Sequence, residues 1–282
     1  MLQRSARHMS GLRWPRRQSI DAFQNRILGF FEKYGRDLPF RNTTDPYCIT
    51  VSEFMLHQTQ VERVLPKYES WIKRWPDWEA LARASRRDVL SMWSGLGYNR
   101  RAIYLRECAR QIADWHGGDL PHDPQLLVRL PGIGPYTARA ILIFAFNEPL
   151  IAIDTNIRRV LLHEFGWPAD VSPTDLTRLA EKVLYTPDPR TWHYALMDYS
   201  RLALPKQISA IPPLTRQSRF EGSTRQIRGE IIRRLTIRKS VRRSTIARDL
   251  GRTLDEVDRA VEALCREGLI TTAGQVIRLF EA

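Results

Sequence analysis

One aspartate stands in an otherwise apolar run, twenty residues after the glycine-rich turn that ends at Gly134. Asp154 follows Leu150–Ile153, and burying a carboxylate among such residues costs free energy unless it caps a helix or takes part in chemistry. As an N-cap it would accept the N–H of Ile157 and begin a helix. As a reactive group it would counter the positive charge that develops on a sugar when a glycosidic bond breaks. The two roles are compatible.

The turn before it has the residues of an anion-binding site. Pro131–Gly134 separates an apolar helical face at Leu126–Leu130 from a second one at Ala138–Ala145. Glycine allows positive φ and close approach of another backbone, so the N–H groups of the turn and of the next helix can point at a phosphate oxygen without any lysine. The plainer alternative is a hairpin of two helices with an ordinary glycine turn.

The rest of the chain predicts helix after helix. The apolar spacing places the early helices at residues 20–34, 47–65, 68–75, 78–84, 87–94 and 100–115. Later ones are expected at 227–235, 244–250 and 253–267, followed by a two-stranded hairpin within 268–279. Three helices and a hairpin are typical of a winged helix-turn-helix. The expected fold class is therefore all-α, a two-lobed helical domain followed by a small winged-helix-like domain with a short β-hairpin.

Length and composition indicate more than one domain. A chain of 282 residues with 43% hydrophobic content can bury a core and is expected to divide. We expect a basic N-terminal arm (1–19), the helical domain (20–204), a proline-containing linker (205–223) and the winged-helix-like domain (224–282). No apolar run is long enough to span a bilayer and the start lacks a signal-peptide core. The expectation is a monomer of the cytoplasm or nucleoid, with no membrane contact.

The cysteines indicate a reducing compartment and no metal site. Cys48, Cys108 and Cys265 are far apart in sequence and offer neither a disulfide framework nor the spacing of metal ligands. No cofactor is expected from them.

Positive charge is concentrated at two places. Residues 1–17 contribute +5 and residues 216–252 contribute +9, which leaves about −1 of the net +13 for the remainder. Such an arm and second domain favour nucleic acid as the partner, although a solvated basic surface would look the same. The last helix of the second domain begins Leu254-Asp255-Glu256, and this acidic start argues against base readout by that helix.

The basic residues before that helix are left with two possible uses, contact with the DNA backbone or docking of a protein partner. They are Arg233, Arg234, Arg238, Lys239, Arg242 and Arg243.

Several segments together resemble a known family. LPGIGPYTARAI followed by Asp154 resembles the helix-hairpin-helix (HhH-GPD) DNA glycosylases of the endonuclease III superfamily. Lys33–Arg41 is similar to the KYGR-LPWR stretch of the MutY-type adenine glycosylases, Val51–Val61 to their SE-MLQQTQV, and Trp93–Tyr98 to WxGLGY. The resemblance covers about residues 20 to 200, and the combination is specific where each segment alone would be weak.

The resemblance implies a role for each matching residue. Glu53 falls on the general acid that protonates the leaving base, which requires a raised pKa, and Asp154 falls on the carboxylate that stabilises the sugar cation. Asn156 would orient the site carboxylate or a phosphate. Surface exposure of Glu53 on a helix would be the structural alternative.

The DNA contacts implied by the resemblance come from three segments. The hairpin would hold phosphate, Gln58-Thr59-Gln60 would enter the base stack beside a flipped base, and Tyr98 of the WxGLGY segment would support the displaced stack. Tyr98 has simple burial against Trp93 as its alternative. The implied DNA-binding residues are Gly132, Ile133, Gly134, Tyr136, Thr137, His57, Gln58, Thr59, Gln60, Tyr98 and Asn99.

Departures from the family pattern are equally informative. Tyr136 stands where bifunctional members carry the lysine that forms a Schiff base, so we expect a monofunctional glycosylase that uses water; core packing is the alternative role of this tyrosine. Residues 198–222 contain no cysteine where the family usually holds a [4Fe–4S] cluster, and a cluster is not expected. His57 and Asn99 replace the usual Gln and Tyr near the lesion pocket.

Together these observations predict a base-excision-repair glycosylase that acts on double-stranded DNA with a mismatched or damaged base. The expected substrate is adenine opposite 8-oxoguanine or guanine. Two alternatives stay open: excision of thymine or uracil mispaired with guanine, and a non-catalytic protein that only binds mismatched DNA.

Overall fold

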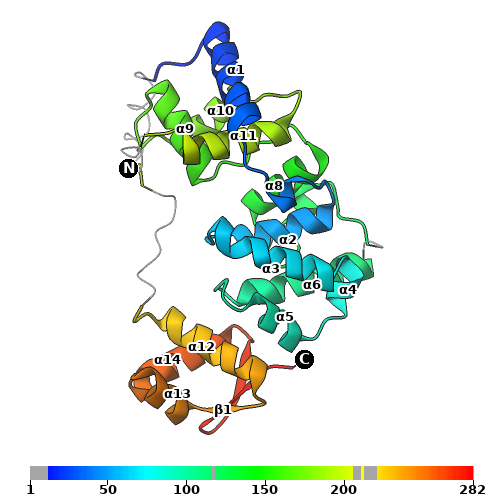
Figure 1. Cartoon of the computed structure of the whole chain (residues 1–282), viewed down its shortest axis with the longest axis vertical. Coiled ribbons are helices and arrows are strands. Elements are labelled where there is room, and N and C mark those ends of the chain that lie inside the picture. The colour runs from blue at the N-terminus through cyan, green and yellow to red at the C-terminus, as the bar shows by residue number, and fades with distance from the viewer. Residues whose placement is uncertain (1–11, 116–117, 206–210, 213–220, 282) are drawn as a thin grey trace, which may run out of the picture. The chain divides into compact units, whose positions relative to one another are not determined.

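The computed structural model describes residues 12–115, 118–205, 211–212 and 221–281 (Figure 1). It divides into two compact units: Met1–Thr44 with Pro135–Arg216, and Asp45–Gly134 with Gln217–Ala282. The basic arm expected at residues 1–19 and the linker expected at 205–223 lie largely outside the described residues. No helix within the described part combines the length and apolar character needed to cross a membrane.

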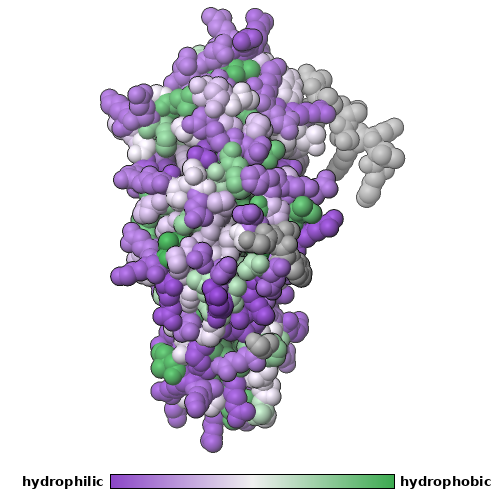
Figure 2. Space-filling model, turned by 90° about the vertical axis from the view of Figure 1, so that its right-hand side faces the viewer, coloured by the Kyte–Doolittle hydropathy of each residue, from purple (hydrophilic) through white to green (hydrophobic). Residues whose placement is uncertain are grey.

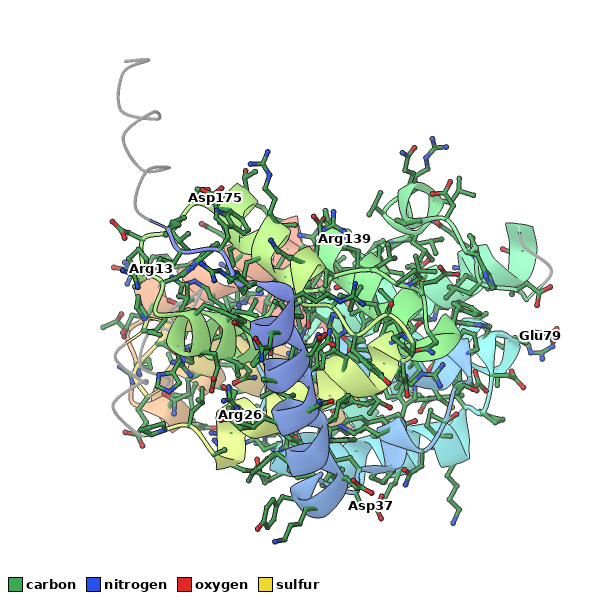
Figure 3. The ribbon with its side chains drawn as sticks, turned by 90° about the horizontal axis from the view of Figure 1, so that it is seen from above. Arg13, Arg26, Asp37, Glu79, Arg139 and Asp175 are labelled. Carbon is green, nitrogen blue, oxygen red and sulfur yellow. The ribbon has the colours of Figure 1, made fainter. Side chains whose placement is uncertain are left out.

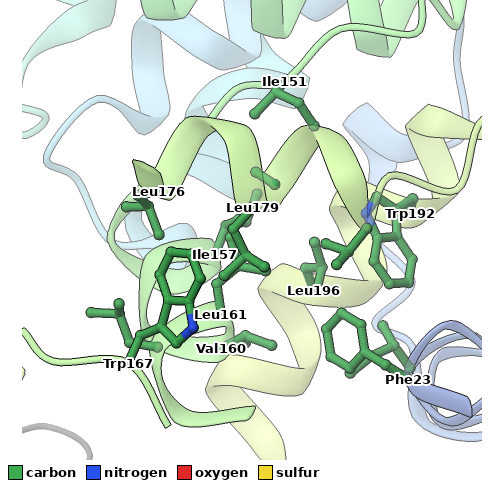
Figure 4. Packing of buried hydrophobic residues seen from close by; sticks show 14 of the residues in the cluster. Phe23, Ile151, Ile157, Val160, Leu161, Trp167, Leu176, Leu179, Trp192 and Leu196 are labelled. Atoms are coloured by element: carbon green, nitrogen blue, oxygen red, sulfur yellow. The ribbon is translucent and has the colours of Figure 1, made fainter. Parts of the chain in front are cut away.

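The first unit is helical around one apolar core. It contains α1 (Arg17–Tyr34), the short 3-10 helix η1 (Pro39–Arg41), α8 (Pro135–Phe146), α9 (Thr155–Phe165), α10 (Pro173–Lys182) and α11 (Pro189–Leu202). In the core, the Phe23 ring of α1 packs edge-on against Trp192 of α11, with ring centres 5.5 Å apart (Figure 4). The same ring packs edge-on against Phe165 of α9. This packing fixes α9, the helix that begins just after Asp154.

A buried ion-pair network explains the Lys33–Arg41 segment that sequence reasoning associated with the family. Arg36 donates its backbone N–H and its Nε–H to the Asp198 carboxylate of α11, both at 2.8 Å. Arg41 makes a two-point contact with the same carboxylate and lies over the Tyr194 ring. These contacts lower the pKa of Asp198 against the opposing effect of its burial. The segment therefore anchors η1 to α11.

The second unit begins with six helices: α2 (Pro46–Leu56), α3 (Val61–Arg74), α4 (Trp78–Ala82), α5 (Arg86–Trp93), α6 (Arg100–Trp115) and α7 (Pro124–Leu127). Trp71 is fully buried and packs edge-on against Trp75 and Trp93. The single helix predicted over residues 47–65 is wrong, because α2 ends at Leu56 and α3 starts at Val61. Periodicity missed the break since both helices present apolar residues to the same core.

The C-terminal part of this unit is a winged helix, as the sequence predicted. It consists of α12 (Thr224–Ile237), β1 (Val241–Arg242), α13 (Arg243–Leu250), α14 (Leu254–Arg266), β2 (Ile270–Ala273) and β3 (Val276–Leu279). The strands form an antiparallel sheet in the order β1-β3-β2, with Thr272 opposite Ile277 in the hairpin. The two-residue strand β1 was not predicted, because it is too short to show an alternating pattern.

The acidic residues of α14 serve its own fold. Glu256 and Thr253 form a capping box, in which the Glu256 carboxylate accepts the Thr253 N–H at 2.9 Å. Asp258 pairs with Arg243 of α13 at 2.8 Å. Both arrangements stabilise the start of a helix or its contact with a neighbour, so these acids have a structural reason to be there.

Most of the face shown in Figure 2 is hydrophilic, with hydrophobic side chains in small separate patches. Charged side chains project from the helices, as Arg26 does from α1 in Figure 3. The apolar side chains of the described residues lie mainly inside the two units, where they fix the helices that carry the site.

Candidate active site and DNA interface

Asp154 caps α9, as the residue pattern predicted. Its Oδ1 accepts the N–H of Ile157 at 2.7 Å, and its Oδ2 accepts the side-chain amide of Asn156 at 2.9 Å. The carboxylate is therefore held in one orientation by the first turn of a well-packed helix. Asn156 orients this carboxylate, which is one of the two roles the sequence suggested for it.

The surroundings of Asp154 disfavour its negative charge. Burial raises the pKa of this carboxyl group, against the lowering effect of its hydrogen bonds to Ile157 and Asn156. No lysine or arginine forms an ion pair with it within the described part of the chain, since nearby Arg158 and Arg159 donate to the backbone carbonyls of Pro212, Ala169 and Ile211. A poorly solvated carboxylate of this kind interacts strongly with any cation placed against it.

The strand-like segment before Asp154 is fixed by a buried histidine that sequence reasoning missed. His193 of α11 is 1% exposed, and its Nε2 accepts the N–H of Ala152 at 3.3 Å. Its Nδ1 lies 2.7 Å from the Pro189 carbonyl, which assigns the ring proton to Nδ1. Burial lowers the pKa of His193 to about 4, so the ring is neutral and can make both contacts. An apolar-face histidine gives no sequence signal of this role.

Glu53 lies on α2 in the second unit. It is half-buried, between the buried side chains of Ser52 and Phe54. This position differs from the fully exposed helical carboxylate that was the alternative. Glu53 remains the candidate general acid.

The loop between α2 and α3 carries backbone strain at a predicted DNA-contact residue. Gln58 has φ 57°, a left-handed conformation that costs a residue with a side chain of order 1–3 kcal/mol. Tyr98, in the loop between α5 and α6, has φ 49°. Such strain concentrates at functional sites because the surrounding structure must enforce it. Two of the three described non-glycine residues with positive φ thus belong to the predicted DNA interface.

One arginine holds both loops in place by hydrogen bonds. Arg101 of α6 donates Nη1 to the carbonyls of Phe54 at 2.6 Å and His57 at 2.7 Å, where α2 ends. Its Nη2 donates to the Thr59 hydroxyl at 3.1 Å and to the carbonyls of Leu96 and Gly97.

These bonds satisfy the last carbonyls of a helix and join them to the second loop, which is a role for a positive charge at a helix C-terminus. Burial lowers the pKa of Arg101 to about 10, which keeps it charged at neutral pH. Arg101 was not recognised from the sequence, because the hydrogen bonds it makes are to backbone atoms of other segments.

Three further residues of these loops are predicted DNA contacts. His57 and Gln60 are exposed, and Asn99 is half-buried at the start of α6. Desolvation of the imidazole and the charge of Arg101 lower the pKa of His57, which favours its neutral form.

The glycine turn is built differently at its two glycines. Gly132 has φ 79°, and a Cβ there would lie 2.7 Å from the Phe54 ring and 2.8 Å from Tyr104, so only glycine fits. A Cβ on Gly134 would meet nothing within 4 Å. Gly132 therefore packs the turn against α2 and α6, whereas Gly134 leaves open space in which an approaching phosphate can lie close to the backbone.

The turn leads directly into α8, whose first amides have no partner within the helix. Tyr136 is half-buried in its first turn, while the Thr137 and Ile133 side chains are buried. The Thr137 residue can therefore offer a phosphate its backbone N–H, whereas the Ile133 N–H already donates to the Leu130 carbonyl at 3.2 Å. Such a turn followed by a helix N-terminus is a general anion-binding arrangement.

The predicted residues fall into two groups. The first unit holds Asp154, Asn156, Tyr136 and Thr137, and the second holds Glu53, the His57–Gln60 loop, Tyr98, Asn99 and Gly132–Gly134. Each group is organised internally, by α9 and His193 in the first unit and by Arg101 in the second.

The cysteines do not fit an iron–sulfur cluster. Four thiolates are required, and the chain has three, on α2 (Cys48), α6 (Cys108) and α14 (Cys265). Burial raises the pKa of the Cys108 thiol, which disfavours the thiolate that metals bind.

The site so described is a fixed, poorly solvated carboxylate together with a helical hairpin suited to phosphate. The HhH-GPD superfamily base excision DNA repair proteins match residues 51–185 of the chain. The adenine DNA glycosylase of Mycobacterium tuberculosis is 35% identical over 272 residues, covering 87% of the chain and 89% of that protein. The adenine DNA glycosylase of Mycolicibacterium smegmatis is 36% identical, covering 86% and 91%.

A thymine-DNA glycosylase and two solved structures are also similar. The thymine-DNA glycosylase of Aeropyrum pernix is 34% identical over 178 residues, covering 62% of the chain and 75% of that protein. The solved structure of a thermostable thymine-DNA glycosylase has a TM-score of 0.61 at 27% identity and covers 67% of the chain and 90% of its own. A non-covalent endonuclease III–DNA complex, at 18% identity and a TM-score of 0.59, covers 68% of the chain and 89% of its own. These structures share the mostly helical architecture, which confirms the predicted fold class.

The chain belongs to the HhH-GPD superfamily of base excision DNA repair proteins. It is a DNA glycosylase, an enzyme that hydrolyses N-glycosyl bonds in DNA, as the sequence predicted.

Proposed function

We propose that this glycosylase removes adenine mispaired with 8-oxoguanine or guanine, by hydrolysis and without cleaving the DNA strand. The observation that carries the proposal is the Asp154 carboxylate, held by two hydrogen bonds in surroundings that raise its pKa. The length over which the chain is similar to adenine DNA glycosylases supports the choice of base.

The proposed reaction uses each unit for one task. The target nucleotide leaves the base stack, because its glycosidic bond is not accessible inside the duplex. Glu53 donates a proton to a ring nitrogen of the departing adenine as the bond between C1′ and that base breaks. Asp154 stabilises the cationic sugar that remains, and a water molecule adds to C1′ with loss of a proton.

The hydrolytic outcome follows from Tyr136. A phenol cannot form the Schiff base that a lysine forms with the sugar, so no covalent intermediate leads to strand cleavage. The abasic sugar is the product, and its strand breaks only under alkali.

Retention of Glu53 favours adenine over thymine, since departure of a purine benefits more from ring protonation than departure of a pyrimidine. The similarity to thymine-DNA glycosylases, together with His57 and Asn99 in place of the usual Gln and Tyr, makes excision of thymine or uracil opposite guanine the second candidate.

Single-turnover excision from labelled duplexes tests these assignments. The duplexes contain A opposite 8-oxoguanine, A:G, T:G or U:G, each analysed with and without alkali. We expect alkali-dependent breaks with the two adenine duplexes. Breaks without alkali would refute the role of Tyr136, a preference for T:G or U:G would favour the second candidate, and no excision with retained binding would favour a non-catalytic binding protein.

Two substitutions test the site. Asp154→Asn should abolish turnover while duplex binding remains, and full activity would remove Asp154 from the mechanism. Gly134→Asp should weaken duplex binding by placing a negative charge at the phosphate position. Gly134→Asn is the matched control, because it adds a side chain of the same size as aspartate without the negative charge, at a position where a Cβ meets no neighbour in the protein. Equal binding by the two Gly134 variants would contradict a phosphate contact at the turn.

A further inference from the structure

The winged helix is fixed to the other helices of the second unit by two adjacent arginines of α5. Arg87 donates to the carbonyls of Leu235 and Arg238, at the end of α12, and pairs with Glu281 at 3.0 Å. Arg86 donates to the Gly268 carbonyl at 2.6 Å and lies over the ring of Phe280. Helix α12 itself packs on α5. The winged helix is thus held by bonds to its backbone at several points and forms a fixed extension of this unit.

This attachment brings the first turn of α12 to a predicted DNA-contact residue. Arg225 donates Nη1 to the Tyr98 hydroxyl at 3.1 Å, and its guanidinium carbon lies 5.8 Å from the centre of the Tyr98 ring. Tyr98 is 40% exposed. The surface that carries Tyr98 therefore continues onto α12.

The continuation is a pocket that two arginines line. It has a volume of about 540 Å³ and is lined by Gly222, Ser223, Thr224, Arg225, Ile227, Glu256 and Arg259. The one carboxylate in this lining, Glu256, already accepts hydrogen bonds from the backbone and hydroxyl of Thr253 and lies 3.6 Å from Arg252. Arg259 acts electrostatically on Glu256 as Arg252 does, so the arginines around this single carboxylate outnumber it and leave the pocket favourable to an anion.

Other arginines of the winged helix are engaged with acids of the same module. Arg233 and Arg234 bind Glu230, and Arg243 binds Asp258. Three of the six basic residues that the sequence offered for backbone contact are therefore committed to the fold. The acidic capping residues of α14 likewise disfavour insertion of that helix into a groove.

We propose that the sugar–phosphate backbone of the bound duplex passes from Tyr98 to the pocket at the first turn of α12, where Arg225 of α12 and Arg259 of α14 bind phosphate. This inference rests on the proposed function, because it takes Tyr98 as part of the DNA interface. The winged helix then adds affinity without reading bases, and the partner of this pocket is DNA rather than protein.

The test is the salt dependence of duplex binding by the full-length chain, measured by fluorescence anisotropy with an undamaged labelled duplex. Removing one phosphate-binding charge lowers the slope of log K against log salt by about 0.9. We expect Arg225→Gln and Arg259→Gln each to lower the slope by this amount, with binding about tenfold weaker near 0.1 M salt. Arg225→Lys should keep the slope, because it keeps the charge while altering the bond to Tyr98.

Arg238→Gln is the matched control. Arg238 is exposed just beyond the other end of α12, and its substitution should leave the slope unchanged. Wild-type slopes for Arg225→Gln and Arg259→Gln would overturn the proposal, as would a lower slope for Arg238→Gln alone. The salt slope measures binding, and excision by the wild type measures activity. Unchanged slopes for the two arginine variants, beside normal adenine excision by the wild type, would refute only this inference. Lowered slopes for these variants, without excision by the wild type, would refute only the proposed function.

Discussion

His193 connects the pH dependence of stability to the segment that carries Asp154. The ring donates from Nδ1 toward the Pro189 carbonyl and accepts the Ala152 N–H at Nε2, and only the neutral imidazole can do both. Replacing it by glutamine, in His193→Gln, removes the titrating group and keeps a side chain that can accept a hydrogen bond. The variant therefore isolates the contribution of protonation.

The magnitude follows from the two pKa values. The unfolded chain binds a proton at this histidine near pH 6.5, and the folded chain near pH 4. Because the folded pKa is the lower one, this stability is complete above about pH 6.5 and is lost as the pH falls toward 4. The difference in pKa corresponds to about 3 kcal/mol, of which about 2.5 kcal/mol is lost by about pH 4.5.

Urea unfolding between about pH 7 and pH 4.5 measures this loss. The free energy of unfolding of the wild type should fall by about 2.5 kcal/mol more than that of His193→Gln over this range. His163, exposed on α9, is the matched control, and His163→Gln should follow the wild-type curve. Parallel curves for wild type and His193→Gln would show that the ring is not held neutral and would refute the hydrogen-bond assignment.

The remaining predictions concern the loops and the carboxylate. Arg101→Lys should lower the free energy of unfolding by about 2–4 kcal/mol, because it loses charge-assisted bonds to several carbonyls. Arg100→Lys, at an exposed position, should change it by less than about 0.5 kcal/mol. Similar values for both variants would show that Arg101 does not fasten the loops. Asp154→Asn should raise the free energy of unfolding at pH 7, since the folded-state pKa of Asp154 is raised. This gain should shrink as the pH falls toward about 4, where the carboxyl group becomes protonated in the folded and the unfolded chain, and a less stable variant at pH 7 would show that the ionised carboxylate stabilises the fold. Gln58→Gly should be more stable than Gln58→Ala by about 1 kcal/mol in thermal or urea unfolding, because glycine tolerates φ 57°, and equal stabilities would contradict strain at this residue.

Several features of this protein were determined by local sequence. The apolar spacing predicted α6 and the winged-helix elements close to their observed bounds, and the pattern around Asp154 predicted its N-cap bond to Ile157. Helix caps and amphipathic faces depend on residues a few positions apart, so a single sequence contains the required information. The segments that resemble known glycosylases also predicted the family.

What the sequence did not show depends on contacts between distant segments. The break after Leu56 was missed because the apolar pattern continues from α2 into α3, and the contact that holds the end of α2, its carbonyls bonded to Arg101, comes from another helix. The role of His193 likewise requires α11 to lie beside the segment before Asp154. The sequence thus determined which residues are available for chemistry, whereas the tertiary structure decided which side chains hold them in place, since burial and long-range hydrogen bonds exist only in the folded chain.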